Sequence, residues 1–260
     1  MTRGGASPRP NRPGRVALRI VLGLPDVITV ALFDLDGVLT GTAVLHRKAW
    51  KKAFDAFLAE RAGGADAPGF VEFTEQDYLD HVDGRPREDG VRAFLASRGI
   101  TDVDAKTVTA IGEKKNDMFL ESLAEDGGQA YPGSVRYLEA ARDAGLRIAV
   151  VTSSKNGGPV LEAADLSKFV EVRVDGIDIA ERGLNGKPAP DSYLLGAELM
   201  GVPPAQAAVF EDAISGVQAG AAGEFGYVVG VDRVGGNQAE AMRAAGADVV
   251  VNDLDELLPA

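Results

Sequence analysis

The chain has 260 residues, a formal net charge of −12 at pH 7 and no cysteine. The negative charge argues against general binding to nucleic acid or to an anionic membrane surface, and the lack of cysteine excludes disulfides, thiolate catalysis and cysteine-based zinc sites. Because the chain also has only two histidines, we expect any bound metal to be a hard cation with oxygen ligands, such as Mg²⁺. A phosphate-bearing substrate would need that metal or a local group of basic side chains.

The start of the chain differs in composition from the rest. Residues 1–20 hold five arginines, three prolines and no acidic residue, which is typical of a disordered tail; an over-extended start is the other interpretation. The short apolar stretch around Arg19 is interrupted by that charge and makes a poor signal peptide, and no apolar run reaches the ~20 residues that span a bilayer. We therefore expect a cytoplasmic protein whose folded part begins near residue 21.

The first predicted strand, Val27–Phe33, ends at Asp34, Asp36 and Gly37. Such an apolar run suits a parallel strand that is covered on both faces, and open α/β sheets place their chemistry at the carboxyl ends of such strands. Because side chains alternate along a strand, the two aspartates point to the same side, where they repel unless a cation or a proton intervenes. Taken alone, the pattern is better explained by turn-forming aspartates at a strand end.

The next part of the chain is predicted to be helical, apart from a weak strand candidate at Phe70–Phe73. The predicted helices are Leu45–Ala59, Thr74–His81, Arg87–Ser97 and Asp104–Leu123. A helical block of this size between two strands is more than a crossover connection. We therefore predict that residues 42–129 form a cap domain, inserted into a core domain of residues 21–41 and 130–260.

Beyond residue 130 the pattern changes to a regular alternation of helices and strands. The predicted strands are Arg147–Val151, Phe169–Val174, Ala207–Phe210, Tyr227–Val231 and Asp248–Val251. The predicted helices are Ser134–Ala144, Pro159–Ala164, Asp191–Met200, Ile214–Ala221 and Gln238–Ala245. Strands that alternate with helices form a parallel sheet with right-handed crossovers. The predicted fold class is therefore α/β, with a Rossmann-like parallel sheet as the core.

Three further strand ends carry polar side chains. Thr152 and Ser153 begin a polar stretch after one strand, Lys187 precedes a proline after the next, and Glu211 and Asp212 follow a third. Each has an ordinary explanation by itself: a capped turn, a surface lysine and a helix N-cap. Together with the two aspartates of the first strand, they place acids for Mg²⁺ beside a hydroxyl and a lysine that would hold a phosphate. That combination indicates phosphoryl transfer.

These four strand ends resemble the motifs of the haloacid dehalogenase superfamily of phosphotransferases, across residues 27–251. The resemblance implies that Asp34 is the nucleophile, which forms an aspartyl phosphate, and that Asp36 is the general acid and base. It implies that Thr152 and Lys187 bind the transferring phosphoryl group. It also implies a Mg²⁺ site made by Asp34, the Asp36 carbonyl and Asp212, with Glu211 close by.

The predicted cap resembles more narrowly the β-phosphoglucomutase family. The residues that carry this resemblance are Thr42, His46, Trp50, Gly84, Arg85, Arg87, Lys115, Ser153, Ser154, Lys155 and Asn156. By resemblance, His46 and Lys115 couple closure of the cap to the position of the general acid, while Arg87 with Ser154, Lys155 and Asn156 holds the phosphate that is not reacting. Without the resemblance, His46 would be a packed histidine, Trp50 a core residue, and Arg87 and Lys115 surface charges.

The resemblance implies a Mg²⁺-dependent enzyme that interconverts β-glucose 1-phosphate and glucose 6-phosphate through a bisphosphate. A closing cap works in a monomer, so we expect a monomer, although the sequence leaves the oligomeric state open. The chain departs from the family pattern at two positions. Asp83 stands where family members can have a lysine, and Gly41 stands where they commonly have an aspartate. These differences affect the expected sugar preference more than the expected class of reaction. The nearest alternative is a sugar-phosphate phosphatase of the same superfamily, with water as the acceptor. A phospho-accepting signalling module is another alternative, although it needs no cap over its aspartate. The last alternative is an inactive binding protein. The presence of every acid of the motifs argues against it.

Overall fold

The structure is a computed structural model that describes residues 22–259, so the tail predicted at 1–20 lies outside the described residues. Its core is a six-stranded sheet in the order β3-β2-β1-β4-β5-β6, and all neighbouring strands are parallel. The strands are β1 Val30–Phe33, β2 Arg147–Val151, β3 Val172–Val174, β4 Ala207–Glu211, β5 Tyr227–Val231 and β6 Val249–Val251. The α/β fold class predicted from the sequence is confirmed.

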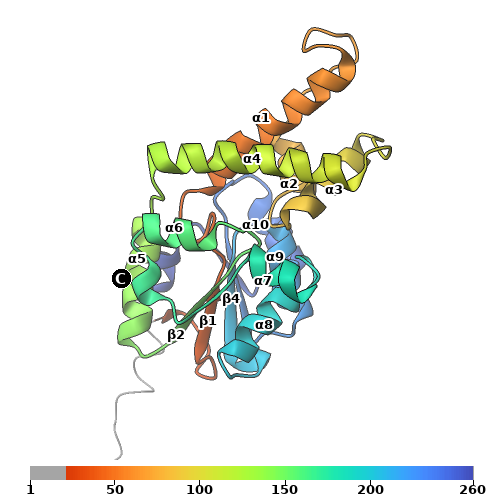
Figure 1. The fold of residues 1–260 in the computed structure, drawn as a ribbon. Helices are drawn as coiled ribbons and strands as arrows, with labels where there is room; N and C mark the ends of the chain where they lie inside the picture. The colour runs from red at the N-terminus through yellow and green to blue at the C-terminus, as the bar shows by residue number, and fades with distance from the viewer. Residues whose placement is uncertain (1–21, 260) are drawn as a thin grey trace, which may run out of the picture.

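Helices cover both faces of this sheet. They are α5 Pro132–Asp143, α6 Gly157–Ala163, α7 Gly176–Arg182, α8 Asp191–Leu199, α9 Ile214–Ala222 and α10 Gln238–Ala245. The buried side chains of α5 and α6 pack on one face, and those of α8 and α9 pack on the other (Figure 1). Among residues 22–259, no helix combines the length and the apolar character needed to cross a membrane.

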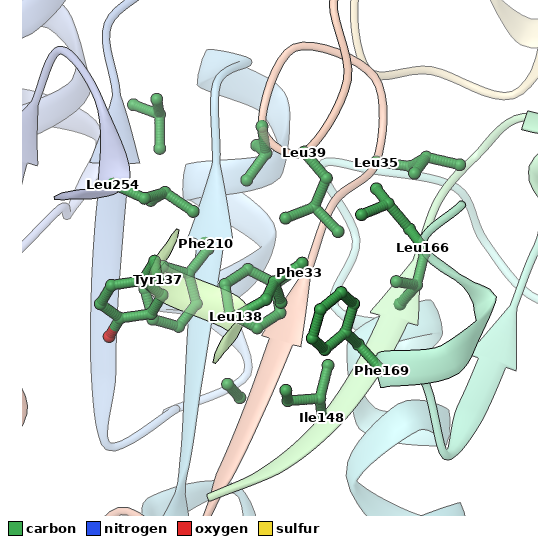
Figure 2. Packing of buried hydrophobic residues seen from close by; sticks show 14 of the residues in the cluster. Phe33, Leu35, Leu39, Tyr137, Leu138, Ile148, Leu166, Phe169, Phe210 and Leu254 are labelled. Carbon is green, nitrogen blue, oxygen red and sulfur yellow. The ribbon is translucent and has the colours of Figure 1, made fainter. Parts of the chain in front are cut away.

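Strand β1 lies in the middle of the sheet and is buried along its whole length. Its side chains alternate between the two faces, so Leu32 packs on the α8 side and Phe33 on the α5 side. Phe33 stacks on Phe210 of β4 with ring centroids 4.3 Å apart, beside Tyr137 of α5 (Figure 2). Packing from both sides therefore fixes the strand that ends at Asp34.

Four helices follow β1 and lie together beyond one end of the sheet (Figure 1). They are α1 Ala43–Ala62, α2 Glu75–His81, α3 Arg87–Ser97 and α4 Ala105–Asp126. These helices bury an aromatic cluster of their own, made by Trp50, Phe54, Phe73, Tyr78 and Phe94. The near ends of α1 and α4 also join the main core through Leu45 and Phe119. We propose residues 42–129 as the cap domain, because much of its apolar surface is buried between its own helices.

The structure corrects several predicted elements. The first strand begins at Val30, because residues 25–28 form a hydrogen-bonded turn. The third strand begins only at Val172, because Ser167–Phe169 form a 3₁₀ helix. The weak strand candidate at Phe70–Phe73 is wrong, since this segment has no strand pairing.

One helix of the core was not predicted at all. The isoleucines of helix α7, Ile177 and Ile179, are two residues apart, which is not the spacing of one helix face, and only Ile179 is buried. It begins at a capping box in which Asp175 and Asp178 exchange hydrogen bonds with backbone N–H groups. Several other helix ends differ from the prediction by a few residues, which is the usual uncertainty of a boundary.

Candidate active site

The carboxyl end of β1 carries Asp34 into a buried ion-pair group. Lys187, from the loop before α8, donates to Asp34 Oδ1 at 2.6 Å and to Glu211 Oε1 at 2.5 Å, and its side chain is fully buried. The Tyr193 hydroxyl donates to the same Glu211 oxygen at 3.0 Å. Burial opposes the charge of Lys187, but the two carboxylates outweigh it and raise the lysine pKa above its ordinary value. The lysine is therefore a fixed cation beside Asp34.

Three acids form a cluster at this end of the sheet. Carboxylate oxygens of Asp34, Glu211 and Asp212 lie within 4.8 Å of one another. Burial raises the pKa of Asp34 to about 8, although Lys187 opposes the shift. Burial and the acids around it, Asp83 foremost, raise the pKa of Asp212 well above its ordinary range. One lysine does not balance so many buried carboxylates, and an all-oxygen donor set suits a hard divalent cation. These residues therefore fit a metal ion.

The turn after β1 requires a glycine. Gly37 has a φ of +94°, which side chains other than hydrogen rarely allow. A Cβ at this position would lie 1.8 Å from Asp212 Oδ2. Asp212 therefore lies directly against the turn that follows Asp34, and the sequence pattern Asp-Leu-Asp-Gly has a steric reason for its last residue.

Asp36 occupies different surroundings from Asp34. Its Oδ1 accepts a hydrogen bond from the Thr42 hydroxyl, which lies 2.6 Å from the Thr40 hydroxyl. His46 Nε2 lies 3.3 Å from the same Asp36 oxygen. Burial works against ionisation of Asp36, but His46 and Thr42 outweigh it and lower the pKa of this carboxyl. The two aspartates of the motif therefore have pKa values displaced in opposite directions, because their surroundings differ.

His46 connects Asp36 to the cap helix α4. Lys115 Nζ lies 2.5 Å from His46 Nδ1, while the other ring nitrogen, Nε2, faces Asp36. Burial lowers the pKa of His46 below its ordinary value and lowers the pKa of Lys115 to about 7. The Lys115 nitrogen lies 5.2 Å from the ring centroid of Trp50 and 4.9 Å from that of Phe119. The position of α4 is thus linked to the position of Asp36.

Basic and hydroxyl side chains occupy the other end of the cavity. Arg87 Nη2 donates to Asn116 Oδ1 at 2.7 Å, and no carboxylate among the described residues pairs with this arginine. Lys155 of the core pairs with Glu88 of the cap, Nζ to Oε1, at 3.1 Å. The Ser154 hydroxyl lies in the same wall. Glu88, Glu113 and Asp117 attract Arg87 only from beyond ion-pair distance, so its guanidinium can still bind an anion at this end of the cavity.

The loop between α2 and α3 lies against the core. The Ser215 hydroxyl of α9 donates to the Asp83 carbonyl at 3.0 Å, and the Ser153 hydroxyl donates to the Gly84 carbonyl at 2.8 Å. Gly84 has a φ of +71°, and a Cβ there would lie 2.3 Å from the Ser215 oxygen. A larger residue would be strained and would collide with the core. These contacts hold the cap over the end of the sheet.

One cavity joins the acidic and the basic ends. The predicted site residues that line it are Asp34, Asp36, His46, Trp50, Gly84, Arg85, Arg87, Lys115, Thr152, Ser153, Ser154, Lys155 and Asp212. Four other predicted residues do not line the cavity but are hydrogen-bonded to residues that do: Thr42, Asn156, Lys187 and Glu211. The structure therefore brings the predicted residues together, while their roles stay predictions.

Some residues of the site were not predicted. Tyr78 and Asp83 line the cavity, and the tyrosine hydroxyl is hydrogen-bonded to the Asp83 carboxyl, whose pKa is raised by burial to about 6. Asn116 and Tyr193 support the wall from behind. Asp83 could have been found from the sequence, because an acid directly before Gly84 is unusual. The position of Asn116 next to Lys115 was a weaker indication that it belongs to the site. Nothing in the sequence pattern indicated the two tyrosines.

Comparison with known proteins agrees with this architecture. Residues 28–223 match the model of the haloacid dehalogenase-like hydrolase family, and the chain belongs to this family. A β-phosphoglucomutase of Mycobacterium tuberculosis is 55% identical over 96% of this chain and 98% of its own length. Hexitol phosphatase A of Escherichia coli is 30% identical over 87% of this chain and 91% of its own length.

A solved structure shows the same likeness. The β-phosphoglucomutase of Clostridium difficile superimposes with a TM-score of 0.72 at 25% identity, over 88% of this chain and 93% of that chain. The resemblance to the haloacid dehalogenase superfamily and to its β-phosphoglucomutase-like branch, first inferred from the motifs, is thereby confirmed.

Proposed function

We propose that the protein is a β-phosphoglucomutase, which interconverts β-glucose 1-phosphate and glucose 6-phosphate through an aspartyl phosphate and a bisphosphate. The observation that carries this proposal is the two-ended cavity. Asp34 and Asp36 lie at one end, and Arg87, Ser154 and Lys155 lie at the other. A bisphosphate intermediate needs two anion sites at once, one for the reacting phosphate and one for the other. The relative from Mycobacterium tuberculosis carries the same activity in its name.

In the first half of the reaction, a carboxylate oxygen of Asp34 attacks phosphorus, and the bond from phosphorus to the donor oxygen breaks. Asp36 must be protonated for this step, in which it gives its proton to that leaving oxygen. Lys187 and the Thr152 hydroxyl lie beside Asp34 and would bind the phosphoryl oxygens as their charge develops. Lys187 also offsets the charge of Asp34 itself and so favours the ionised form of the nucleophile.

In the second half, a hydroxyl of the sugar attacks the phosphorus of the aspartyl phosphate. Asp36, now ionised, takes the proton of that hydroxyl, and the bond between Asp34 and phosphorus breaks. His46 and Thr42 hold the Asp36 carboxyl in place by contacts to the same oxygen. Trp50 forms part of the apolar wall that excludes water from this step.

We propose Mg²⁺ as the metal, held by Asp34, the Asp36 carbonyl and Asp212, with Glu211 alongside. The cluster of oxygen donors and the raised pKa values of Asp34 and Asp212 support a divalent cation there. When bound, the ion supplies positive charge that offsets the carboxylates and the phosphoryl oxygens.

A sugar-phosphate phosphatase is the second candidate function. The hexitol phosphatase of Escherichia coli is also a relative of the chain, and the chemistry at Asp34 and Asp36 serves water as well as sugar. The basic end of the cavity favours the mutase, because a phosphatase that releases one phosphate needs no second anion site.

The experiment follows the products of purified protein with Mg²⁺, β-glucose 1-phosphate and a trace of glucose 1,6-bisphosphate, by phosphorus NMR. The proposal predicts that glucose 6-phosphate accumulates and that inorganic phosphate stays a minor product. Mainly inorganic phosphate would contradict the mutase and support the phosphatase. The α anomer of glucose 1-phosphate serves as the control and should not be consumed.

A further inference from the structure

Helix α4 forms a groove for the side chain of Arg87. A Cβ at Gly112 would lie 2.8 Å from Arg87 Cδ and 3.1 Å from its Cγ, so the aliphatic part of the arginine lies directly on the helix. Four residues later, Asn116 Oδ1 accepts a hydrogen bond from Arg87 Nη2 at 2.7 Å. Because residues four apart share one helix face, Arg87 runs along α4 from the glycine to the asparagine.

The same oxygen of Asn116 also accepts a hydrogen bond from the core. Asn156 Nδ2 donates to it at 2.9 Å, just before α6 begins. An arginine has no acceptor, so the contact with Arg87 determines which atom of the Asn116 amide faces it. One amide oxygen therefore connects two predicted phosphate ligands, one from the cap and one from the core.

We propose that Asn116 is a positioning residue that holds Arg87 and Asn156 for the phosphate that is not reacting, and that Gly112 provides the space this requires. The inference rests on the proposed mutase function, because it assumes a second phosphate at this end of the cavity. The direct partner of the guanidinium is a neutral amide, and the carboxylates of Glu88, Glu113 and Asp117 attract it only from beyond ion-pair distance; a carboxylate in direct contact would compete with the phosphate. Holding the side chain in advance also removes part of the entropy cost of binding.

Two variants test the proposal. Asn116→Leu keeps the approximate size of the side chain and removes the acceptor, and Gly112→Ala places a methyl group where Arg87 lies. The matched control is Glu121→Gln, an exposed residue of α4. For each protein we would measure the concentration of glucose 1,6-bisphosphate that half-saturates turnover. We would also measure formation of the aspartyl phosphate from acetyl phosphate, a donor without a second phosphate.

The proposal predicts that both variants raise the half-saturating concentration of the bisphosphate about tenfold, the size expected for one lost charge-assisted contact. The rate with acetyl phosphate should stay within about twofold, because that donor does not use the Arg87 end. Alanine forms helix better than glycine, which offsets part of the cost of displacing the Arg87 side chain. A melting curve of Gly112→Ala separates a weakened fold from the loss of Arg87 positioning.

Two results would overturn the inference. One is an unchanged half-saturating concentration in both variants while the parent protein still makes glucose 6-phosphate. The other is an equal loss with the bisphosphate and with acetyl phosphate, which would indicate general damage. If the parent protein makes no glucose 6-phosphate, the proposed function itself is wrong, and this outcome is visible before any variant is measured.

Discussion

The two ends of the cavity are built in different ways. At the acidic end, Asp34 and Asp212 come shortly after the neighbouring strands β1 and β4, whose residues Phe33 and Phe210 are paired in register. Backbone hydrogen bonds of the sheet therefore set their separation. At the basic end, Arg87 comes from the cap and Lys155 from the core, and side-chain hydrogen bonds to Asn116 and Glu88 set their positions.

This difference suggests a division of roles. The acidic end is rigid and carries the groups that make and break bonds to phosphorus. The basic end is formed only when the cap lies against the core. It binds the phosphate that is not reacting at the acidic end. We therefore expect substitutions at the acidic end to stop phosphoryl transfer, and substitutions at the basic end to change which acceptor is used.

The largest effect is expected for Asp34→Asn. The amide has the same shape but is not a nucleophile, so formation of the phosphoenzyme should fall on the order of 10⁴-fold or more. Acid quenching after reaction with a labelled phosphate donor measures this directly. Because Glu211 still pairs with Lys187, the fold should survive, and a melting curve is the control. A phosphoenzyme formed at the parental rate would exclude Asp34 as the nucleophile.

Asp36→Asn should have the next largest effect. The amide can neither give nor take the proton, so production of glucose 6-phosphate should fall about 10²–10⁴-fold. Acetyl phosphate has a leaving group that needs no proton, so its reaction with Asp34 should be much less affected. Measurement of both reactions in the same variant separates the two roles. An equal loss in both would show that Asp36 does not act as the general acid.

A smaller effect is expected from the buried Lys115. Burial lowers its pKa to about 7 in the folded protein, whereas in the unfolded chain it has the ordinary value of about 10.4. Between these values the unfolded chain holds the proton and the folded protein has lost it. The contribution of this lysine to the free energy of unfolding should therefore rise with pH by about 1 kcal/mol per unit across pH 7–10.

The measurement is urea unfolding of the parent protein and of Lys115→Met at several pH values. The difference between their free energies of unfolding should follow the slope given above, because methionine fills the site without a titrating group. A difference that is constant from pH 7 to pH 10 would show that Lys115 keeps its proton in the folded protein.

The smallest effect is expected for Glu88→Gln. The pair between Glu88 and Lys155 joins the cap to the core, but both side chains are about one third exposed. Such pairs contribute about 0–1 kcal/mol, so urea unfolding should show a loss below about 1 kcal/mol. The released Lys155 should bind the bisphosphate as well as before or better. A large loss of stability would mean that this pair, rather than the hydroxyl contacts of the cap loop, holds the cap closed.

The same comparison explains what the sequence could predict. The acidic end was predictable from the residues, because apolar runs end at Asp34 and at Glu211, and parallel strands bring their carboxyl ends together. The basic end needed the resemblance to a known family, since Arg87 and Lys115 alone look like surface charges. The contacts of Asn116 and Gly112 with Arg87 depend on how closely α3 approaches α4, and no local pattern shows that distance.

The fold prediction was also limited where a local turn competes with strand pairing or where a helix has no clear apolar face. Residues 27–29 have the side chains of a strand, yet the turn before them delays pairing until Val30. The long cap helices were predictable because their apolar faces repeat over many residues, whereas the isoleucines of α7 are two apart and form no helical face.

The division between the two ends is tested most directly by the fate of the phosphoenzyme in Arg87→Ala. The parent protein and the variant are phosphorylated on Asp34 and mixed with glucose 6-phosphate, and the fraction of phosphate transferred to sugar is compared with the fraction released to water. Arg92→Ala, an exposed arginine of α3, is the control. We predict that Arg87→Ala is phosphorylated by acetyl phosphate at the parental rate but loses about tenfold in transfer to sugar relative to water. An unchanged ratio of sugar to water would contradict the account.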